Sequence, residues 1–116
     1  MNPMDCIFCK IIGGSVPSTM VYQDDQTVAF NDVNPAAPVH VLVVPREHIA
    51  GAAALTEAHA GLLGHIWITI PKIAAQLGIS DGFRVVTNSG ASAGQTVGHL
   101  HFHLQSPAPS VIMDRS

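Results

Sequence analysis

Histidines alternate with apolar residues in the stretch Gln95-Thr96-Val97-Gly98-His99-Leu100-His101-Phe102-His103-Leu104. Side chains on a β-strand point alternately to its two faces. The pattern therefore predicts a strand with His99, His101 and His103 on one face and apolar residues packed on the other. The small residues of the preceding loop, Ser89-Gly90-Ala91-Ser92-Ala93-Gly94, are typical of a turn that leads into a strand.

This predicted strand holds three of the seven histidines of the chain. A single histidine in a strand is usually a structural residue, but neighbouring imidazoles repel one another when they are protonated. Clusters of titratable groups are typical of functional sites. The row of histidines therefore indicates metal binding or proton and phosphate chemistry.

The length and composition favour one small domain that pairs with a second copy. A chain of 116 residues can form a single modest core. Its hydrophobic content of 47%, against 11% charged residues, would leave much apolar surface uncovered in a monomer, so a homodimer is expected. The net charge is −3 and the five Lys and Arg residues are scattered, which argues against binding to a nucleic-acid polymer.

The N-terminal residues lack the basic region and the apolar run of a signal peptide. The longest mostly apolar stretch, residues 62–70, is too short and too interrupted to span a bilayer. We therefore expect a cytoplasmic protein without a membrane partner. Its two cysteines, Cys6 and Cys9, form a Cys-x-x-Cys pair, which inside a cell indicates half of a metal site or a redox pair.

One short and one long helix are predicted. Asp5 can cap a helix over residues 6–12, and the apolar stripe of that helix must pack against another element. Apolar residues at helical spacing predict the long helix over residues 56–77, with Pro71 causing a kink or a break. Its two histidines, His59 and His65, are expected at solvent or an interface. Four further strands are predicted at residues 19–22, 27–32, 39–45 and 83–87.

The histidine stretch resembles the signature of the histidine triad superfamily of nucleotide hydrolases and transferases. Other stretches resemble its small nucleotide-binding branch, Hint, in the same order and spacing: Cys6-Ile7-Phe8-Cys9-Lys10-Ile11-Ile12, Val28-Ala29-Phe30-Asn31-Asp32, Pro38-Val39-His40-Val41-Leu42-Val43-Val44-Pro45-Arg46-Glu47-His48 and Asn88-Ser89-Gly90. The resemblance implies an α+β fold with a five-stranded antiparallel sheet, and a homodimer whose two sheets join into ten strands. We assign residues 1–116 to one domain, with a helix region at 5–13, a core at 18–104 and an irregular tail at 105–116.

The resemblance implies a hydrolase that cleaves the P–N bond of purine nucleoside phosphoramidates, and related adenylates, to give a nucleoside monophosphate such as AMP. His101 matches the nucleophile of the family. A neutral imidazole can attack the α-phosphorus and form an intermediate that water cleaves. His103 would bond the phosphoryl oxygens, and His40 would fix the charge and orientation of the reactive ring. His99 would support the site or bind zinc. No cofactor is required for this chemistry.

The resemblance also implies a substrate-binding set. Asp32 would accept hydrogen bonds from the ribose hydroxyls, and Asn88 would donate to a phosphate oxygen or the leaving group, although both residue types are also common in turns. The other members would line the base pocket or surround the phosphate: Ile7, Phe8, Ile11, Phe30, Leu42, Gly94, Gln95, Thr96 and Val97.

A structural zinc ion is implied in family members that carry the Cys-x-x-Cys pair. Its ligands here would be Cys6, Cys9, His48 and His99, a set suited to a closed tetrahedral site. From the residues alone, two cysteines and two distant histidines are suggestive only.

Two other functions stay open. His-x-His with a third histidine can form a catalytic metal site, although a glutamate or further convergent ligands would then be expected. A nucleotide-binding or partner-binding module with little catalysis is the second alternative. After Leu104 the chain departs from the family pattern, and Gln105-Ser106-Pro107-Ala108-Pro109 predicts the end of the strand. This departure leaves the leaving-group specificity and the dimer contact undetermined.

Overall fold

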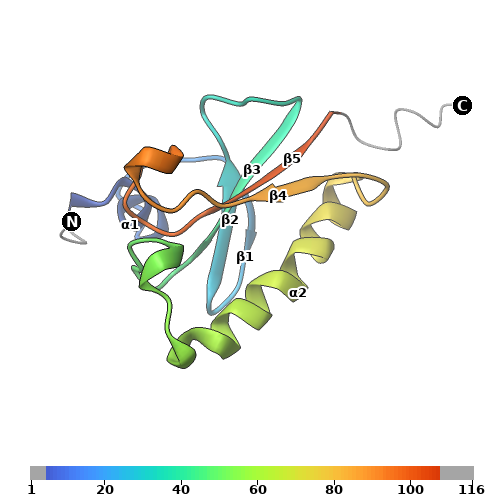
Figure 1. Ribbon diagram of the computed structural model, residues 1–116. Coiled ribbons are helices and arrows are strands. Elements are labelled where there is room, and N and C mark those ends of the chain that lie inside the picture. Colours follow the sequence, from blue (N-terminus) through green and yellow to red (C-terminus); the bar gives the residue numbers. More distant parts are fainter. Residues whose placement is uncertain (1–4, 108–116) are drawn as a thin grey trace, which may run out of the picture.

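A five-stranded antiparallel sheet forms the centre of the structure, a computed structural model that describes residues 5–107 (Figure 1). The strand order is β1-β2-β3-β5-β4. The strands and helices are β1 (Met20–Gln23), β2 (Thr27–Asn31), β3 (Val39–Pro45), β4 (Arg84–Val86), β5 (Phe102–Ser106), α1 (Ile7–Ile12) and α2 (Ala60–Leu77). The predicted α+β class and the five-stranded antiparallel sheet are confirmed.

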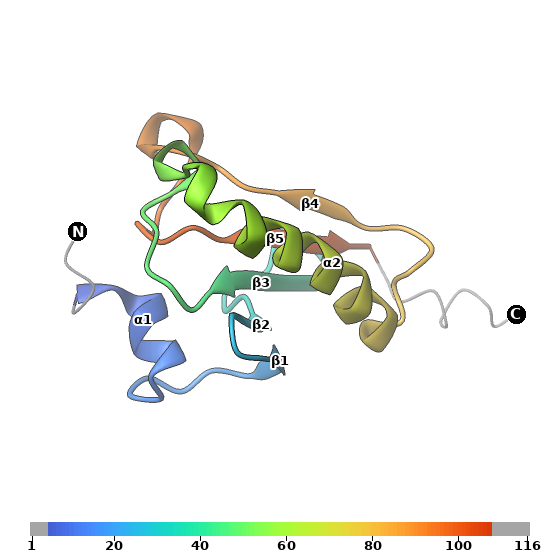
Figure 2. The ribbon, with the colours of Figure 1, turned by 90° about the horizontal axis from the view of Figure 1, so that it is seen from below.

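The two faces of the sheet pack against different helices, because alternate residues of one strand point to opposite sides. Val41 and Val43 of β3 lie in a core with Ile66 and Ile70 of α2. The intervening Leu42 points to the other face and lies in a second core with α1. Figure 2 shows α2 running along the sheet, while α1 lies near one end of β2 and β3. Every β3 residue after the first is therefore buried, as an uninterrupted apolar strand predicts.

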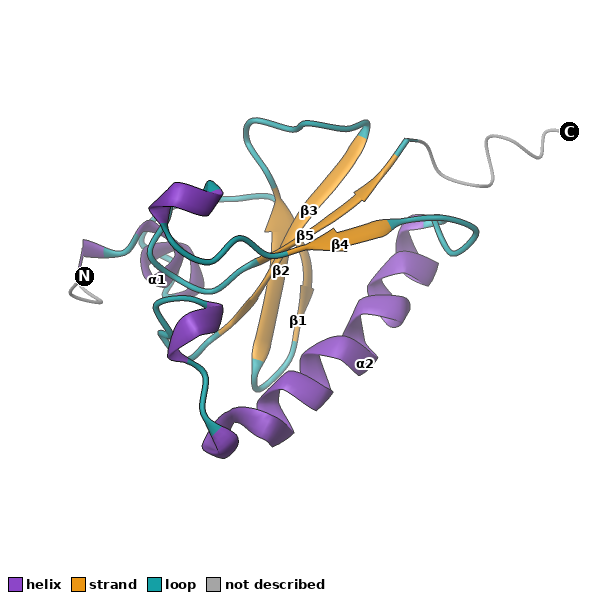
Figure 3. Cartoon of the chain, viewed as in Figure 1, coloured by secondary structure: helices purple, strands orange, loops and turns teal. Residues whose placement is uncertain are grey.

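The histidine strand begins later than predicted. β5 starts at Phe102, which pairs with Val43 of β3. The preceding residues leave the sheet: the Leu100 amide donates to the carbonyl of Ile49 at 2.7 Å, in the loop after β3. The prediction that one strand carries all three histidines is therefore wrong, since His99 and His101 precede β5. Figure 3 shows the loop that leads into β5.

The C-terminal boundary is also different. Gln105 pairs with His40 and Ser106 pairs with Val39, so β5 extends two residues past the predicted end of the core. The predicted irregular tail at 105–116 is wrong for these two residues, because both continue the ladder with β3. The rest of that predicted tail, from residue 108 onward, lies outside the described residues.

Two details of the helices differ from the sequence-based expectation. Cys6 caps α1, since its Sγ accepts a hydrogen bond from the Cys9 amide at 3.3 Å, and Asp5 does not take this position. The predicted break at Pro71 does not occur, and α2 continues through it. Pro71 lies on the exposed side of α2, where the carbonyl of Trp67 that loses its donor is also near solvent.

The long helix is preceded by a short 3-10 helix, Glu57–His59, which Thr56 caps. Its His59 bonds the Thr56 amide at 2.9 Å and lies 3.3 Å from a carboxylate oxygen of Glu47. Farther along α2, the Nε2 atom of His65 lies 2.8 Å from Oδ2 of Asp24, in the turn between β1 and β2. The His65 side chain is 34% exposed, so it lies partly at solvent as expected, and it also joins α2 to that turn. Among residues 5–107, no helix has the length and hydropathy needed to cross a membrane.

Candidate functional site

A cavity of about 350 Å³ opens between α1, the end of β2 and the segment that carries the histidines. His101 and His103 line it, together with Asp32. A larger hollow of about 550 Å³ lies near the opposite end of β5, around Phe83 and Pro107, and no histidine lines it. We take the smaller cavity as the candidate site, because the groups capable of chemistry converge there.

His101 is held in one tautomer by the backbone. Its Nδ1 lies 2.7 Å from the carbonyl oxygen of His99. A carbonyl only accepts hydrogen bonds, so Nδ1 carries the proton and Nε2 keeps a free lone pair. The ring is 4% exposed and packs edge-on against Phe8, with ring centroids 5.1 Å apart. This arrangement leaves His101 with one nitrogen able to act as a nucleophile.

His103 and His40 form a hydrogen-bonded chain. The Ala36 amide donates to Nδ1 of His40 at 2.9 Å, so the proton of a neutral His40 lies on Nε2. That Nε2 donates to Nδ1 of His103 at 2.9 Å. The proton of His103 must then lie on its Nε2. The backbone donor at Ala36 therefore fixes both rings and leaves His103 with an N–H donor on the other nitrogen.

Burial lowers the pKa of His103, and the charges of His101 and His40 lower it further, while Asp32 opposes them. The neutral form of His103 is thus favoured. Asp32 meets the hydrogen-bonded pair of histidines through its Oδ2, which lies 3.4 Å from Nε2 of His40. Its other oxygen accepts from the Asn34 amide at 2.9 Å.

Asp32, His40 and His103 lie close enough together to hold a metal ion, since one donor atom from each falls within 4.8 Å of the others. The hydrogen bond from Ala36 argues against that use. With Nδ1 of His40 occupied as an acceptor, metal binding at Nε2 would require an anionic imidazolate. The group is better suited to relay a proton than to bind a cation.

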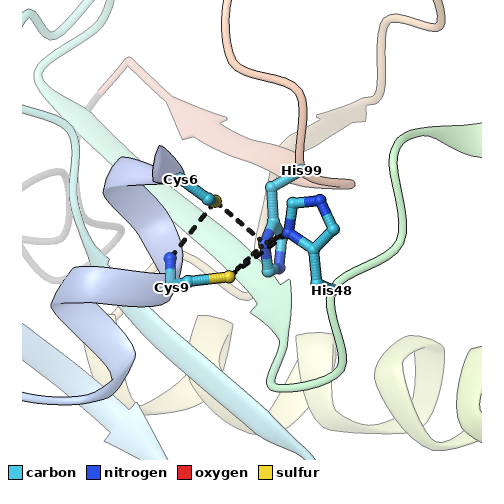
Figure 4. A group of neighbouring side chains, drawn as sticks. All are labelled: Cys6, Cys9, His48 and His99. Carbon is cyan, nitrogen blue, oxygen red and sulfur yellow. Dashed lines mark hydrogen bonds between the residues drawn. The ribbon is translucent and has the colours of Figure 1, made fainter. Parts of the chain in front are cut away.

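A second cluster lies behind His101. In Figure 4, Cys6 and Cys9 extend from α1 toward His48 and His99. Nδ1 of His99 lies 3.4 Å from Sγ of Cys6, 3.5 Å from Sγ of Cys9 and 3.2 Å from Nδ1 of His48. Sγ of Cys9 lies 3.2 Å from Nδ1 of His48. The structure thus brings the four predicted metal ligands together.

The geometry of this cluster fits zinc. With Zn–S bonds of about 2.3 Å and Zn–N bonds of about 2.0 to 2.1 Å, the corners of a tetrahedron lie about 3.3 to 3.8 Å apart. The observed separations of 3.2 to 3.5 Å are close to this range. Nε2 of His99 donates to the carbonyl of Pro45 at 2.9 Å, which directs the lone pair of Nδ1 into the cluster.

The electrostatics of the cluster also call for a cation. Burial raises the pKa of Cys9 to about 11, with the hydrogen bond and charge of Cys6 adding to the effect. Burial likewise lowers the pKa of His99, which favours the neutral ring that binds metals. The Cys9 thiol resists ionisation at such a place unless a positive charge joins it.

Ten of the predicted site residues line the cavity. They are Ile7, Phe8, Ile11, Phe30, Asp32, Leu42, Thr96, Val97, His101 and His103. Asn88, Gly94 and Gln95 do not line it. Nδ2 of Asn88 donates to the carbonyl of Ala93 at 2.9 Å, inside the loop, and Gln95 is turned toward the backbone. Their predicted contact with substrate stays a prediction.

Sequence reasoning missed six residues that line the cavity: Val16, Pro17, Ser18, Asn31, Val33 and Asn34. Val33 and Asn34 follow Asp32 in a tight turn, so their proximity to Asp32 could have been inferred. The first three belong to an irregular segment before β1, whose path no periodicity in the sequence reveals. Ala36 and Pro45 act through backbone atoms, which a sequence pattern cannot identify.

Comparison with known proteins places the chain in a family. Residues 5–115 match the family model described as "Scavenger mRNA decapping enzyme C-term binding". A HIT-like protein of Synechococcus elongatus is 51% identical over 100 residues, which cover 86% of this chain and 88% of that protein. A protein of Zea mays named 14 kDa zinc-binding protein is 44% identical over 100 residues, covering 84% of this chain and 78% of that protein.

Solved structures agree with this placement. A HIT family hydrolase from Clostridium thermocellum superposes with a TM-score of 0.85 at 50% identity, covering 88% of this chain and 90% of that chain. Sequence, fold and site together show that this chain belongs to the histidine triad, or HIT, family.

Proposed function

We propose that the protein is a nucleotide hydrolase that cleaves the P–N bond of purine nucleoside phosphoramidates, and related adenylates, and releases a nucleoside monophosphate. The observation that carries this proposal is the state of His101: Nδ1 is bonded to a carbonyl, and Nε2 has a free lone pair beside the cavity. The similar solved structure of a HIT family hydrolase supports the reaction class.

The reaction proceeds in two displacements. Nε2 of His101 attacks the α-phosphorus and forms a P–N bond to the ring, while the bond from phosphorus to the leaving amine breaks. The His40–His103 pair first takes up one proton beside the Asp32 carboxylate, and Nε2–H of His103 then gives a proton to the departing amine, which leaves the pair neutral. Water then attacks the nucleotidyl-histidine, its proton returns to the relay, and the monophosphate leaves with His101 restored.

The binding of the substrate follows from the lining of the cavity. Apolar residues from α1, β2 and β3, among them Phe8, Phe30 and Leu42, form one wall and suit a flat purine base. Asp32 lies at the polar end, where its carboxylate can accept hydrogen bonds from ribose hydroxyls. The phosphate then falls between the two histidines and Thr96. AMP is the expected product of an adenosine substrate.

The Cys6, Cys9, His48 and His99 cluster holds a structural zinc ion in this proposal. The ligand separations support it, as does the similarity to the maize protein named for zinc binding. A closed set of four ligands leaves no open position for substrate, so the ion supplies folding stability rather than catalysis. It would tie α1 to the loop after β3 and to the segment before β5.

We further propose a homodimer in which β4 strands pair and two sheets form ten strands. β4 is an edge of the sheet, and no described strand pairs with its outer side. On the neighbouring helix, Trp67 is 49% exposed and Ile68 is 63% exposed. An exposed edge and large apolar side chains together are typical of an interface. Sedimentation of the wild type and of Trp67→Glu tests this: a dimer that becomes a monomer supports it.

The test of the activity is hydrolysis of an adenosine phosphoramidate that carries a fluorescent amine. The wild type should turn over, His101→Ala should not, and His59→Ala, outside the cavity, should behave as the wild type. AMP binding and circular dichroism on each variant exclude unfolding as the cause. A folded wild type that binds AMP without turnover would instead identify a nucleotide-binding module. Activity that chelation abolishes in a still folded protein would identify a catalytic metal.

A further inference from the structure

One side chain outside the cavity joins three separate parts of the backbone near the site. Oε1 of Gln95 accepts a hydrogen bond from the Gly90 amide at 2.8 Å. Nε2 of Gln95 donates to the carbonyl of Ala50 at 2.7 Å and to the carbonyl of Val97 at 2.9 Å. Both N–H groups of the carboxamide are thus committed to the backbone, which makes Gln95 a cross-link and not a free group for a ligand.

The loop after β3 leaves room for this side chain. Gly51 is buried, and a Cβ atom on it would lie 2.8 Å from Oε1 of Gln95 and 3.2 Å from Nε2. The φ angle of Gly51 is 175°, an extended conformation that any residue adopts. Glycine is therefore required here by the space that Gln95 occupies and not by the backbone conformation.

The cross-link bears on two segments of the site. Ala50 lies two residues after His48, and the carbonyl between them, from Ile49, accepts from the Leu100 amide at 2.7 Å. Val97 lines the cavity, and its carbonyl also accepts from the His99 amide at 2.9 Å. The bonds of Gln95 therefore continue the same attachment that holds the segment before His101 against the loop after β3.

We propose that Gln95 is a positioning residue: it holds residues 90–97 closed at the phosphate end of the cavity and keeps His101 at the distance and angle needed for attack. The inference rests on the proposed function, because the position of His101 limits the rate only if His101 is the nucleophile. A displacement of about 1 Å in such a group can lower a rate about a hundred-fold.

The test uses two variants that disturb the same cross-link from opposite sides. Gln95→Ala removes all three hydrogen bonds, and Gly51→Ala forces the Gln95 side chain out of its place. Both should lower kcat by about ten- to a hundred-fold and raise KM by less than about five-fold. Gln76→Ala is the matched control for glutamine, since it loses one 2.7 Å bond to the Val21 carbonyl outside the site. Gly82→Ala is the control for glycine, because no atom lies within 4 Å of its added Cβ.

Two further measurements separate positioning from general stability. Hydrogen exchange at the Gly90 amide should quicken about ten-fold in Gln95→Ala and stay unchanged in Gln76→Ala. Affinity for AMP should fall about five-fold in Gln95→Ala, while affinity for adenosine stays unchanged, because the loop faces the phosphate.

The outcomes are distinct. A Gln95→Ala protein that keeps kcat within two-fold of wild type overturns the proposal, as does a rate loss that only follows the loss of folded protein on melting. If the wild type does not hydrolyse the phosphoramidate at all, the proposed function fails by itself. The role of Gln95 is then decided by the two affinities: selective loss of AMP binding supports it, and unchanged binding overturns it.

Discussion

The two groups of histidines on either side of His101 are built from similar residues and yet differ in where the protons lie. In the group with Cys6 and Cys9, the Nδ1 atoms of His48 and His99 face each other at 3.2 Å, with the proton of His99 turned away to Pro45. In the group with Asp32, a proton lies between Nε2 of His40 and Nδ1 of His103, which are 2.9 Å apart.

This difference arises from single backbone atoms. A carbonyl beside His99 holds the proton on one nitrogen and directs the lone pair into the first group. An amide beside His40 donates to its Nδ1, so the lone pair is occupied by the backbone and the Nε2–H is directed at His103 in the second. Converging lone pairs favour a cation, whereas an unbroken donor-to-acceptor chain favours proton transfer. The same residue type therefore serves a metal site or a phosphate site according to one neighbouring backbone group.

Removing the ring between the two groups should have the largest effect. His101→Ala should lower phosphoramidase turnover by at least about a thousand-fold, because the lone pair of His103, the other histidine in the cavity, is occupied by His40. Zinc content and AMP affinity should stay within about two-fold of the wild type, since neither group is altered. Single-turnover assays with AMP titrations measure both quantities. Residual turnover near the wild-type rate would show that His101 is not the nucleophile.

Breaking the first group should remove the metal and the stability that it provides. Cys9→Ser should lose zinc from a wild type that carries about one ion per chain, and its unfolding free energy should fall by several kcal/mol, since structural zinc binding is coupled to folding. Metal analysis by mass spectrometry and thermal melts with and without a chelator measure this. A wild type whose melting temperature ignores the chelator would contradict a structural zinc site.

Breaking the second group should change the rate and spare the metal. His40→Ala removes the donor to His103, so we expect kcat to fall about ten- to a hundred-fold while zinc content stays at the wild-type level. The comparison with Cys9→Ser is the important one. If His40→Ala also released zinc, the two groups would not be independent, and the assignment of separate roles to them would be wrong.

Much of the fold was accessible from the sequence, because alternation and helical spacing depend on local chemistry. The seven residues of β3 were predicted with their bounds, and the metal ligands and cavity walls were found through the family resemblance. The path of residues 95–101 was not accessible from the sequence. A strand pattern does not reveal that the Leu100 amide bonds the Ile49 carbonyl and not a neighbouring strand of the sheet.

The roles of polar side chains were the least predictable part. Gln95 lies inside the most recognisable motif, yet its bonds go to Ala50, which is far away in the sequence. The tautomers of His40 and His99 depend on an amide and a carbonyl that every residue type carries. His65 contacts the Thr69 hydroxyl within its own helix, but the carboxylate that it meets belongs to a turn between two strands, and helical spacing does not reveal this contact.

The contact of His65 with Asp24 provides a third kind of histidine environment, a hydrogen bond to a carboxylate, and the smallest expected effect. Burial alone would raise the pKa of Asp24, but hydrogen bonds from Gln26, Tyr22, His65 and the Thr27 amide lower it from 3.8 to about 2. The ionised carboxylate is therefore more stable in the folded chain than in the unfolded one. Its contribution is complete above pH 4 and is lost as the pH falls toward 2.

Replacing Asp24 should therefore cost stability in a way that depends on pH. Asp24→Asn should lower the unfolding free energy at pH 7 by about 1 kcal/mol, a value reduced for the partial exposure of the carboxylate, and by less near pH 2. Urea unfolding at the two pH values measures the difference. Asp25→Asn, the exposed neighbour, should show no such dependence. Equal losses at both pH values would mean that Asp24 acts through its shape in the turn and not through its charge. The contact with His65 would then contribute no electrostatic stability.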